Sequence, residues 1–278
     1  MPHKHYVDGT TGFVSLIDHM PREDLDGSIV SAARVSYDSG STTHTRTNQG
    51  LIRYLLRHSH TTPFEMVEFK FHIKMPIFVA RQHLRHRTAS VNEISGRYSV
   101  LPEDFFVPVE LRKQSTTNTQ GSDEPMGDDT ALIESQEASC QEAFKVYDTI
   151  LASGCGRELA RTHLPLSTYT EFFWKINLHN LMHYLRLRMD AHAQKEIRDY
   201  ANMIYKLVEP LCPLTMKAFR DFRLQAIQFS GPEVRALSRY LTGPTIDVPI
   251  HGLSKGEERE FRDKMRHIIN ETVTPRDS

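Results

Sequence analysis

The stretch Val67-Glu-Phe-Lys-Phe-His-Ile-Lys-Met75 decides the fold. Its odd-numbered positions are all apolar, and they alternate with Glu68, Lys70, His72 and Lys74. Successive side chains of a β-strand point to opposite faces of a sheet, so this alternation predicts a strand with one apolar and one polar face. Strands of that kind are typical of antiparallel sheets with one solvated side. We therefore expect an antiparallel sheet that is covered on one face.

Two other stretches have strand composition. Residues 12–20 and Thr168–Ile176 are rich in β-branched and aromatic residues, and the second contains the only tryptophan. A further strand is expected to open at Arg97. Helices are predicted from apolar periodicity and capping residues at 24–36, 47–58, 76–85, 131–153, 157–163, 177–188, 193–208 and 213–229. The predicted fold class is α+β, an antiparallel sheet flanked by helices.

Three local features complete this outline. Thr62 and Glu65 have the spacing of a capping box at a helix start. Residues 88–96 and 113–129 are predicted to be loops, and the second is a polar insertion that buries almost nothing. We expect a single domain over residues 1–230 and a C-terminal extension over 231–278 that ends in an amphipathic helix.

Composition excludes several classes of protein. The 34 basic residues balance 35 acidic ones, for a formal net charge of -1, so the whole molecule is not built to coat nucleic acid or a membrane. No apolar run approaches the roughly 20 residues that span a bilayer, and we expect a cytoplasmic protein. The three cysteines lack Cys-x-x-Cys spacing, which argues against a disulfide framework and a metal site.

Two polar segments are candidate binding sites. Arg85-His-Arg-Thr-Ala-Ser-Val-Asn-Glu-Ile-Ser-Gly-Arg-Tyr98 holds three arginines, whose guanidinium groups match phosphate or carboxylate oxygens. In the predicted helix from Asn177, that residue and Arg188 share a face, so we expect them to line one groove. Ser95 lacks a hydrolase context, and the chain has neither a dinucleotide-binding glycine motif nor a P-loop.

Together these segments resemble the flavin-dependent thymidylate synthases, the ThyX family. Arg85-His-Arg87, seven residues and Ser95 match the family's Arg-His-Arg-x7-Ser signature. Flanking motifs over roughly residues 12–225 match as well: Ala33-Arg-Val-Ser36, His60-x-Thr-Pro-Phe-Glu65, Pro76-Ile-Phe-Val-Ala-Arg-Gln82, Ser90-x-Asn-Glu93, Gly96-Arg-Tyr98, Leu164-Pro-Leu166, Phe172-Phe-Trp174 and Arg188-x-Asp190-x-His-Ala-Gln-x-Glu196.

The resemblance implies an enzyme that methylates dUMP to dTMP. The carbon would come from 5,10-methylenetetrahydrofolate, and NADPH would supply reducing power through bound FAD. It also implies a ThyX-like homotetramer. No cysteine nucleophile is then required, because in this family the reduced flavin supplies hydride and relays the carbon unit. A metal, a membrane and a nucleic acid are not expected.

Residue roles carry over position by position. Positions similar to the family's dUMP contacts are Gln82, Arg85, Glu93, Ser95, Gly96, Arg97, Arg161 and Arg188. Arg188 is the expected catalytic residue, lying against the pyrimidine. Positions similar to the FAD contacts are Ser36, His60, Thr62, Glu65, Arg85, His86, Arg87, Asn92, Glu93, Asn177, His179 and His183. His179 departs from the family pattern, because relatives often have arginine there.

Two alternatives stay open from the sequence. A nucleic-acid-binding module could use Arg81, Arg85, Arg87 and Arg97 on phosphates while Phe69, Phe71 and Tyr98 stack bases. A homologue could also bind dUMP and FAD without turning them over. An assay of dTMP formation separates these possibilities.

Overall fold

The computed structural model describes the chain except residues 1, 36–46, 117–119, 232–233, 235–253 and 271–278. The chain forms two compact units, Met1–Gln225 and Ala226–Ser278. The first unit carries every element of the predicted sheet and all the described candidate site residues. Within the second unit, helix α11 (Lys255–Asn270) is the predicted terminal helix. No helix in the described part of the chain is both long and apolar enough to span a bilayer.

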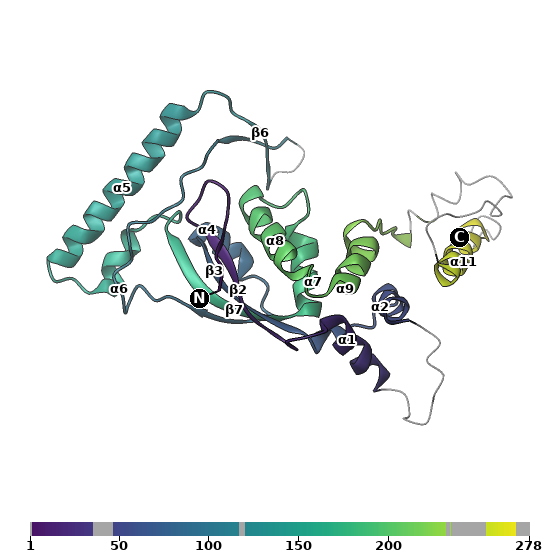
Figure 1. The fold of residues 1–278 in the computed structure, drawn as a ribbon. Coiled ribbons are helices and arrows are strands. Elements are labelled where there is room, and N and C mark those ends of the chain that lie inside the picture. Colours follow the sequence, from purple (N-terminus) through teal and green to yellow (C-terminus); the bar gives the residue numbers. More distant parts are fainter. Residues whose placement is uncertain (1, 36–46, 117–119, 232–233, 235–253, 271–278) are drawn as a thin grey trace, which may run out of the picture. The chain divides into compact units, whose positions relative to one another are not determined.

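The predicted antiparallel sheet is confirmed. Its strands are β1 (His5–Tyr6), β2 (Phe13–Met20), β3 (Glu68–Pro76), β7 (Tyr169–Asn177) and β4 (Ser90–Glu93), in that spatial order. Every neighbouring pair runs antiparallel. Figure 1 labels β2, β3 and β7 of this sheet. The decisive strand β3 lies at the centre, where Phe71 pairs with Trp174 of β7.

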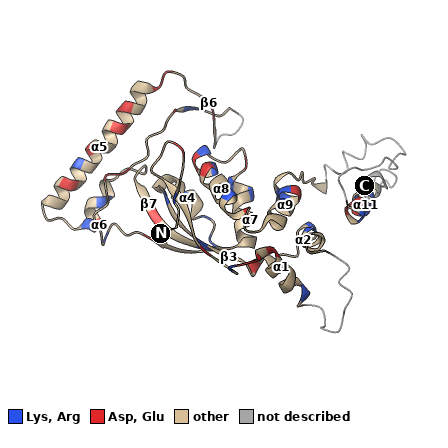
Figure 2. Ribbon diagram, in the orientation of Figure 1, with Lys and Arg blue, Asp and Glu red and all other residues tan. Residues whose placement is uncertain are grey.

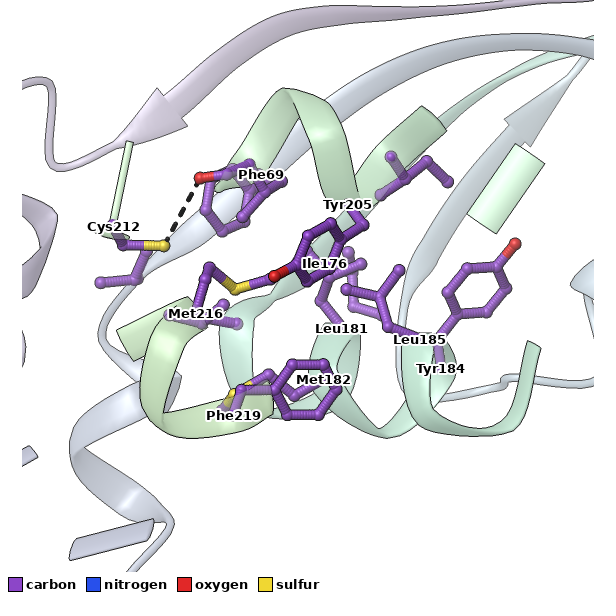
Figure 3. Packing of buried hydrophobic residues seen from close by; sticks show 14 of the residues in the cluster. Phe69, Ile176, Leu181, Met182, Tyr184, Leu185, Tyr205, Cys212, Met216 and Phe219 are labelled. Carbon is purple, nitrogen blue, oxygen red and sulfur yellow. Dashed lines mark hydrogen bonds between the residues drawn. The ribbon is translucent and has the colours of Figure 1, made fainter. Parts of the chain in front are cut away.

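The alternation along β3 sorts its side chains as predicted. Phe69, Phe71 and Ile73 are at most 1 % exposed, whereas Lys70 on the opposite face is exposed. The buried face packs against helices α7 (Leu178–Arg188), α8 (Lys195–Val208) and α9 (Pro213–Phe219). Figure 3 shows this core, with Phe69 among side chains from those helices. Burial of large apolar side chains, each worth about 1.5–3 kcal/mol, holds helices and sheet together.

Side-chain caps mark the starts of two predicted helices, whereas the predicted cap at Thr62 is absent. Asp24 accepts a hydrogen bond from Gly27 N at 2.9 Å at the start of α1 (Leu25–Arg34), and Thr47 caps α2 (Asn48–Arg57). The expected capping box at Thr62 is wrong. Helix α3 (Thr62–Glu65) is capped by Thr61 without a side-chain hydrogen bond, because four residues make a single turn whose position is set by packing of the buried Phe64.

The predicted loop at 88–96 and the strand from Arg97 both need correction. Residues 90–93 form strand β4 on the sheet edge, since β7 offers an open row of backbone groups to them. The pairing continues with Ile94 N donating to Glu171 O at 2.9 Å. After Ser95 the chain turns, and Tyr98 N donates to Ser95 O at 3.0 Å, so Arg97 lies in a turn.

The polar insertion is also more ordered than predicted. Strands β5 (Arg112–Gln114) and β6 (Ser122–Pro125) pair antiparallel within it. Arg112 also forms an ion pair with Glu196 of α8 at 2.5 Å. Hydrogen bonds between the two strands and the ion pair with Glu196 therefore hold this segment, although it has few apolar side chains to bury. Helix α5 (Thr130–Ala152) follows, with the acidic positions seen along it in Figure 2, and Gly154 with φ +85° lies just beyond its end.

The later elements position the site. Helix α6 (Arg157–Ala160) continues into the 3-10 turn η1 (Arg161–His163). Helix α4 (Ile77–His83) follows β3 directly, as expected from Pro76. The helix predicted to reach residue 229 is shorter: α9 continues only through the π-helical turn η2 (Arg220–Leu224). Ile227 and Phe229 are 80 % and 50 % exposed, so no packing prolongs it.

Candidate active site

Helices α4 and α7 bring together three predicted site residues from distant positions. Arg188 Nε donates to His86 Nε2 at 2.9 Å, and an Nη2–H group of Arg188 donates to the backbone oxygen of Gln82 at 3.1 Å. The Gln82 side-chain amide in turn bonds Gln194 Oε1. Arg188 is therefore held at two points, which fixes the direction of its planar guanidinium group.

The protonation state of His86 follows from this contact. Partial burial, together with Arg188 and His183, lowers the pKa of His86 from 6.5 to about 4. The imidazole is thus neutral near pH 7. Because Arg188 always donates, His86 Nε2 must accept and the ring proton must lie on Nδ1. A neutral acceptor beside Arg188 orients the guanidinium without cancelling its positive charge.

Behind this cluster lies His83, which sequence reasoning missed. Its side chain is fully buried, and Nδ1 lies 3.0 Å from the hydroxyl of Tyr184 on α7. The ring also meets Trp174 at a centroid distance of 4.3 Å. Burial, reinforced by His86 and Arg188, lowers the pKa of His83 to about 3. No sequence signal marks this residue, because its partners lie about 90 to 100 residues away.

A second group lies on the turn after β4. Arg97 N donates to Ser95 Oγ at 3.3 Å, which tightens the turn. Gly96 is buried, and a Cβ atom there would lie 3.1 Å from Arg161 Cδ and 3.0 Å from Leu101 Cδ1. The small residue therefore lets η1 approach the turn. Arg97 and Arg161 are both exposed, so they present positive charge to solvent on neighbouring segments.

The arginine at position 97 already has a weak partner. Its Nη2 lies 3.5 Å from Glu158 Oε2, and both side chains are more than half exposed. A surface pair of this kind contributes about 0–1 kcal/mol, so an anionic ligand can compete for Arg97. On β4 itself, Glu93 accepts from Thr170 Oγ1 at 2.6 Å while Asn92 is exposed.

The third group surrounds a cavity of about 210 Å³. His60, His179 and His183, three of the predicted flavin contacts, line it together with Arg186 and Arg223. His183 also meets His86 at a ring-centroid distance of 5.9 Å, so this cavity adjoins the cluster around Arg188. Arg186 and Arg223 were not singled out from the sequence, because only the fold brings α7 and η2 to one cavity.

The remaining predicted residues fall into four situations. Asn177 caps α7 by accepting from Asn180 N at 2.9 Å, so it has a structural role whatever it binds. Thr62 and Glu65 lie on α3, and Arg85 and Arg87 are exposed after α4. Ser36 lies outside the described residues. The binding roles of all these residues remain predictions.

The alternative of a nucleic-acid-binding surface loses two of its three stacking residues and keeps only Tyr98, which is 78 % exposed. Phe69 and Phe71 are 1 % and 0 % exposed, so neither can stack on a base.

Among the described residues no group of three His, Cys, Asp or Glu could hold a metal ion. Burial raises the pKa of the Cys212 thiol, which makes that cysteine a poor nucleophile at neutral pH.

Comparison with known proteins bears on these groups. The family model described as Thymidylate synthase complementing protein, Thy1, matches residues 15–214. A flavin-dependent thymidylate synthase of Dictyostelium discoideum is 48 % identical over 270 residues, covering 94 % of this chain and 86 % of that protein. One of Thermus thermophilus is 49 % identical over 248 residues, covering 89 % and 90 %.

A solved structure is similar as well. It is the UMP/dUMP methylase PolB of Streptomyces cacaoi bound with 5-Br dUMP, with a TM-score of 0.69, 33 % identity, and coverage of 77 % of this chain and 97 % of that one. The family model spans most of β2, the whole of β3, β4 and β7, and all three residue groups described above, apart from Arg223. The chain belongs to the Thy1 family, the flavin-dependent thymidylate synthases.

Proposed function

We propose that this protein makes dTMP by methylating dUMP as a flavin-dependent thymidylate synthase. The observation that carries the proposal is the cluster in which Gln82, His86 and Arg188 meet, held by the two hydrogen bonds of Arg188. These residues come from separate motifs of the family, and their contact in space indicates that the motifs form one site. A positively charged, oriented guanidinium is suited to a ring that gains negative charge.

The dUMP site is built from two of the groups. Arg188 lies against the pyrimidine and stabilises charge that develops on a uracil carbonyl oxygen. Ser95, Gly96, Arg97 and Arg161 bind the phosphate, because the turn after β4 places the exposed Arg97 beside η1, which carries the exposed Arg161. The proposed dUMP residues are Gln82, Arg85, Glu93, Ser95, Gly96, Arg97, Arg161 and Arg188.

The residues around the 210 Å³ cavity fit a flavin dinucleotide. Histidine and arginine N–H groups are the donors that a diphosphate requires, and the described lining includes no carboxylate. FAD supplies the hydride and carries the one-carbon unit when it is bound. The residues proposed to hold it are Ser36, His60, Thr62, Glu65, Arg85, His86, Arg87, Asn92, Glu93, Asn177, His179 and His183.

The finer parts of the proposal concern co-substrates and assembly. The carbon donor is 5,10-methylenetetrahydrofolate and the reductant is NADPH. Residues 1–230 form the catalytic domain, and 231–278 are an extension to it. The protein works in the cytoplasm as a homotetramer in which sites form between subunits. Such an arrangement allows the exposed Asn92, Arg97 and Arg161 to meet ligand held by another copy.

The deciding experiment measures dTMP formation from dUMP, 5,10-methylenetetrahydrofolate and NADPH by purified protein reconstituted with FAD. We expect turnover that requires all four compounds, and an absorbance spectrum typical of bound flavin. Folded protein that binds no FAD would overturn the proposal. Protein that binds FAD and dUMP but forms no dTMP would instead identify a homologue that does not turn over.

A further inference from the structure

We propose that Arg186 and Arg223 form, with His179, the site that binds the diphosphate of the dinucleotide cofactor. This inference rests on the proposed function and deepens it, because it assigns two residues from outside the family signature to one part of the ligand. The three side chains line one cavity between α7, α9 with η2, and the segment after α2. Arg186 and Arg223 are 37 positions apart, and only the fold unites them.

The geometry of α7 separates two tasks on one helix. His179, Met182, His183 and Arg186 recur at spacings of three and four residues, which places them on one helical face. All four line the cavity. Arg188 points elsewhere and bonds Gln82 and His86. The last turn of α7 therefore presents one arginine to the proposed pyrimidine site and another to this cavity.

The electrostatics of the cavity favour an anion. Burial, together with the neighbouring Arg186, lowers the pKa of Arg223, so two guanidinium groups repel one another across the cavity. No acidic side chain is among the residues that line it. In the part of the chain that the structure describes, Arg186 forms no hydrogen bond or ion pair. A bound anion would relieve this repulsion.

Arg223 is held ready for a ligand. One of its amino groups donates to Leu56 O and to Ser59 Oγ, at 2.5 and 3.1 Å, and the other donates to Phe222 O at 3.0 Å. These bonds fix the plane of the guanidinium group and leave further N–H groups for an oxyanion, since arginine has more donors than these three contacts use. A pre-oriented fork loses little entropy when it binds phosphate oxygens.

The two arginines complement the third residue of the site. Position 179 holds histidine, a residue type that titrates near physiological pH, whereas arginine is always charged. Arg186 and Arg223 supply the permanent positive charge that His179 lacks. Each of the two linked phosphates of a dinucleotide carries one negative charge, so each can pair with one of the two guanidinium groups.

The test measures flavin affinity directly. Apoprotein is titrated with FAD, followed by flavin fluorescence, at several salt concentrations. We expect Arg186→Gln to weaken FAD binding at least tenfold and to reduce its salt dependence, with partial recovery in Arg186→Lys. The second substitution His179→Arg, added to Arg186→Gln, should restore affinity. Arg22→Gln is the matched control, because Arg22 is 85 % exposed beside Asp18 and outside the site.

The outcomes separate the two proposals. Arg223→Gln should weaken FAD binding by a similar factor, and circular dichroism shows whether it still folds, since its bonds to Leu56 and Ser59 are also lost. Affinity for dUMP should stay within twofold in Arg186→Gln, which excludes the nucleotide phosphate as occupant. Unchanged FAD affinity in folded Arg186→Gln and Arg223→Gln would overturn this inference alone. Wild-type protein that binds no FAD would overturn the proposed function.

Discussion

Replacing Arg188 by alanine tests how the active-site cluster works. The substitution removes the bonds to His86 at 2.9 Å and to Gln82 O at 3.1 Å, together with one permanent charge. Loss of a pre-oriented donor to developing charge typically lowers kcat by about 100- to 1000-fold, or about 2.7–4 kcal/mol. We expect that loss in dTMP formation, while FAD stays bound through its other contacts.

A second readout does not depend on turnover. Arg188 is the largest electrostatic cause, after burial, of the lowered pKa of His86. Arg188→Ala should therefore raise the pKa of His86 from about 4 toward its ordinary value of 6.5. The pKa is measured by NMR titration of the imidazole protons. Arg188→Lys should keep the low pKa but still lose turnover, because an ammonium group lacks the planar fork.

The control for both measurements is Arg22→Ala, which removes an exposed arginine 3.8 Å from Asp18. It should change neither turnover nor the titration of His86. Turnover of Arg188→Ala equal to that of wild type would remove Arg188 from the site. An unchanged pKa of His86 in that variant would refute the electrostatic reasoning, even if activity were lost.

Three further predictions concern packing and pH. Asp26→Ala should lower the free energy of unfolding by about 3 kcal/mol in urea titrations, because the buried carboxylate accepts from Leu214 N and from the backbone and hydroxyl of Thr215; a loss below 1 kcal/mol would contradict this. Gly96→Ala should raise the KM for dUMP about tenfold through its contact with Arg161 Cδ at 3.1 Å, and leave FAD affinity unchanged. The unfolding free energy should fall as pH drops from 6.5 toward 3, because unfolded His83 binds a proton that the folded protein, with a pKa of about 3, excludes. His83→Asn should flatten that dependence, and an equally steep curve in the variant would refute it.

Several features of the fold were readable from sequence because they depend on neighbours along the chain. Side-chain alternation in residues 67–75 predicted β3 and its buried face, since the period of a strand is local. Asn177 and Thr47 mark helix starts because a cap bonds a backbone N–H three residues on. The family motifs likewise indicated residues 85–95 and Arg188 at the end of α7, because a motif depends only on residue type and spacing along the chain.

Tertiary structure alone decided the rest. Strand β4 forms because β7 presents an open edge some 80 residues later, and its own exposed side chains carry no strand signal. His83 became part of the site through Tyr184, and Arg186 through Arg223. Each of these contacts joins residues far apart in the chain, and a residue's own type does not reveal its distant partner. The sequence by itself determined the elements and the chemical family; the fold determined which charges share a cavity.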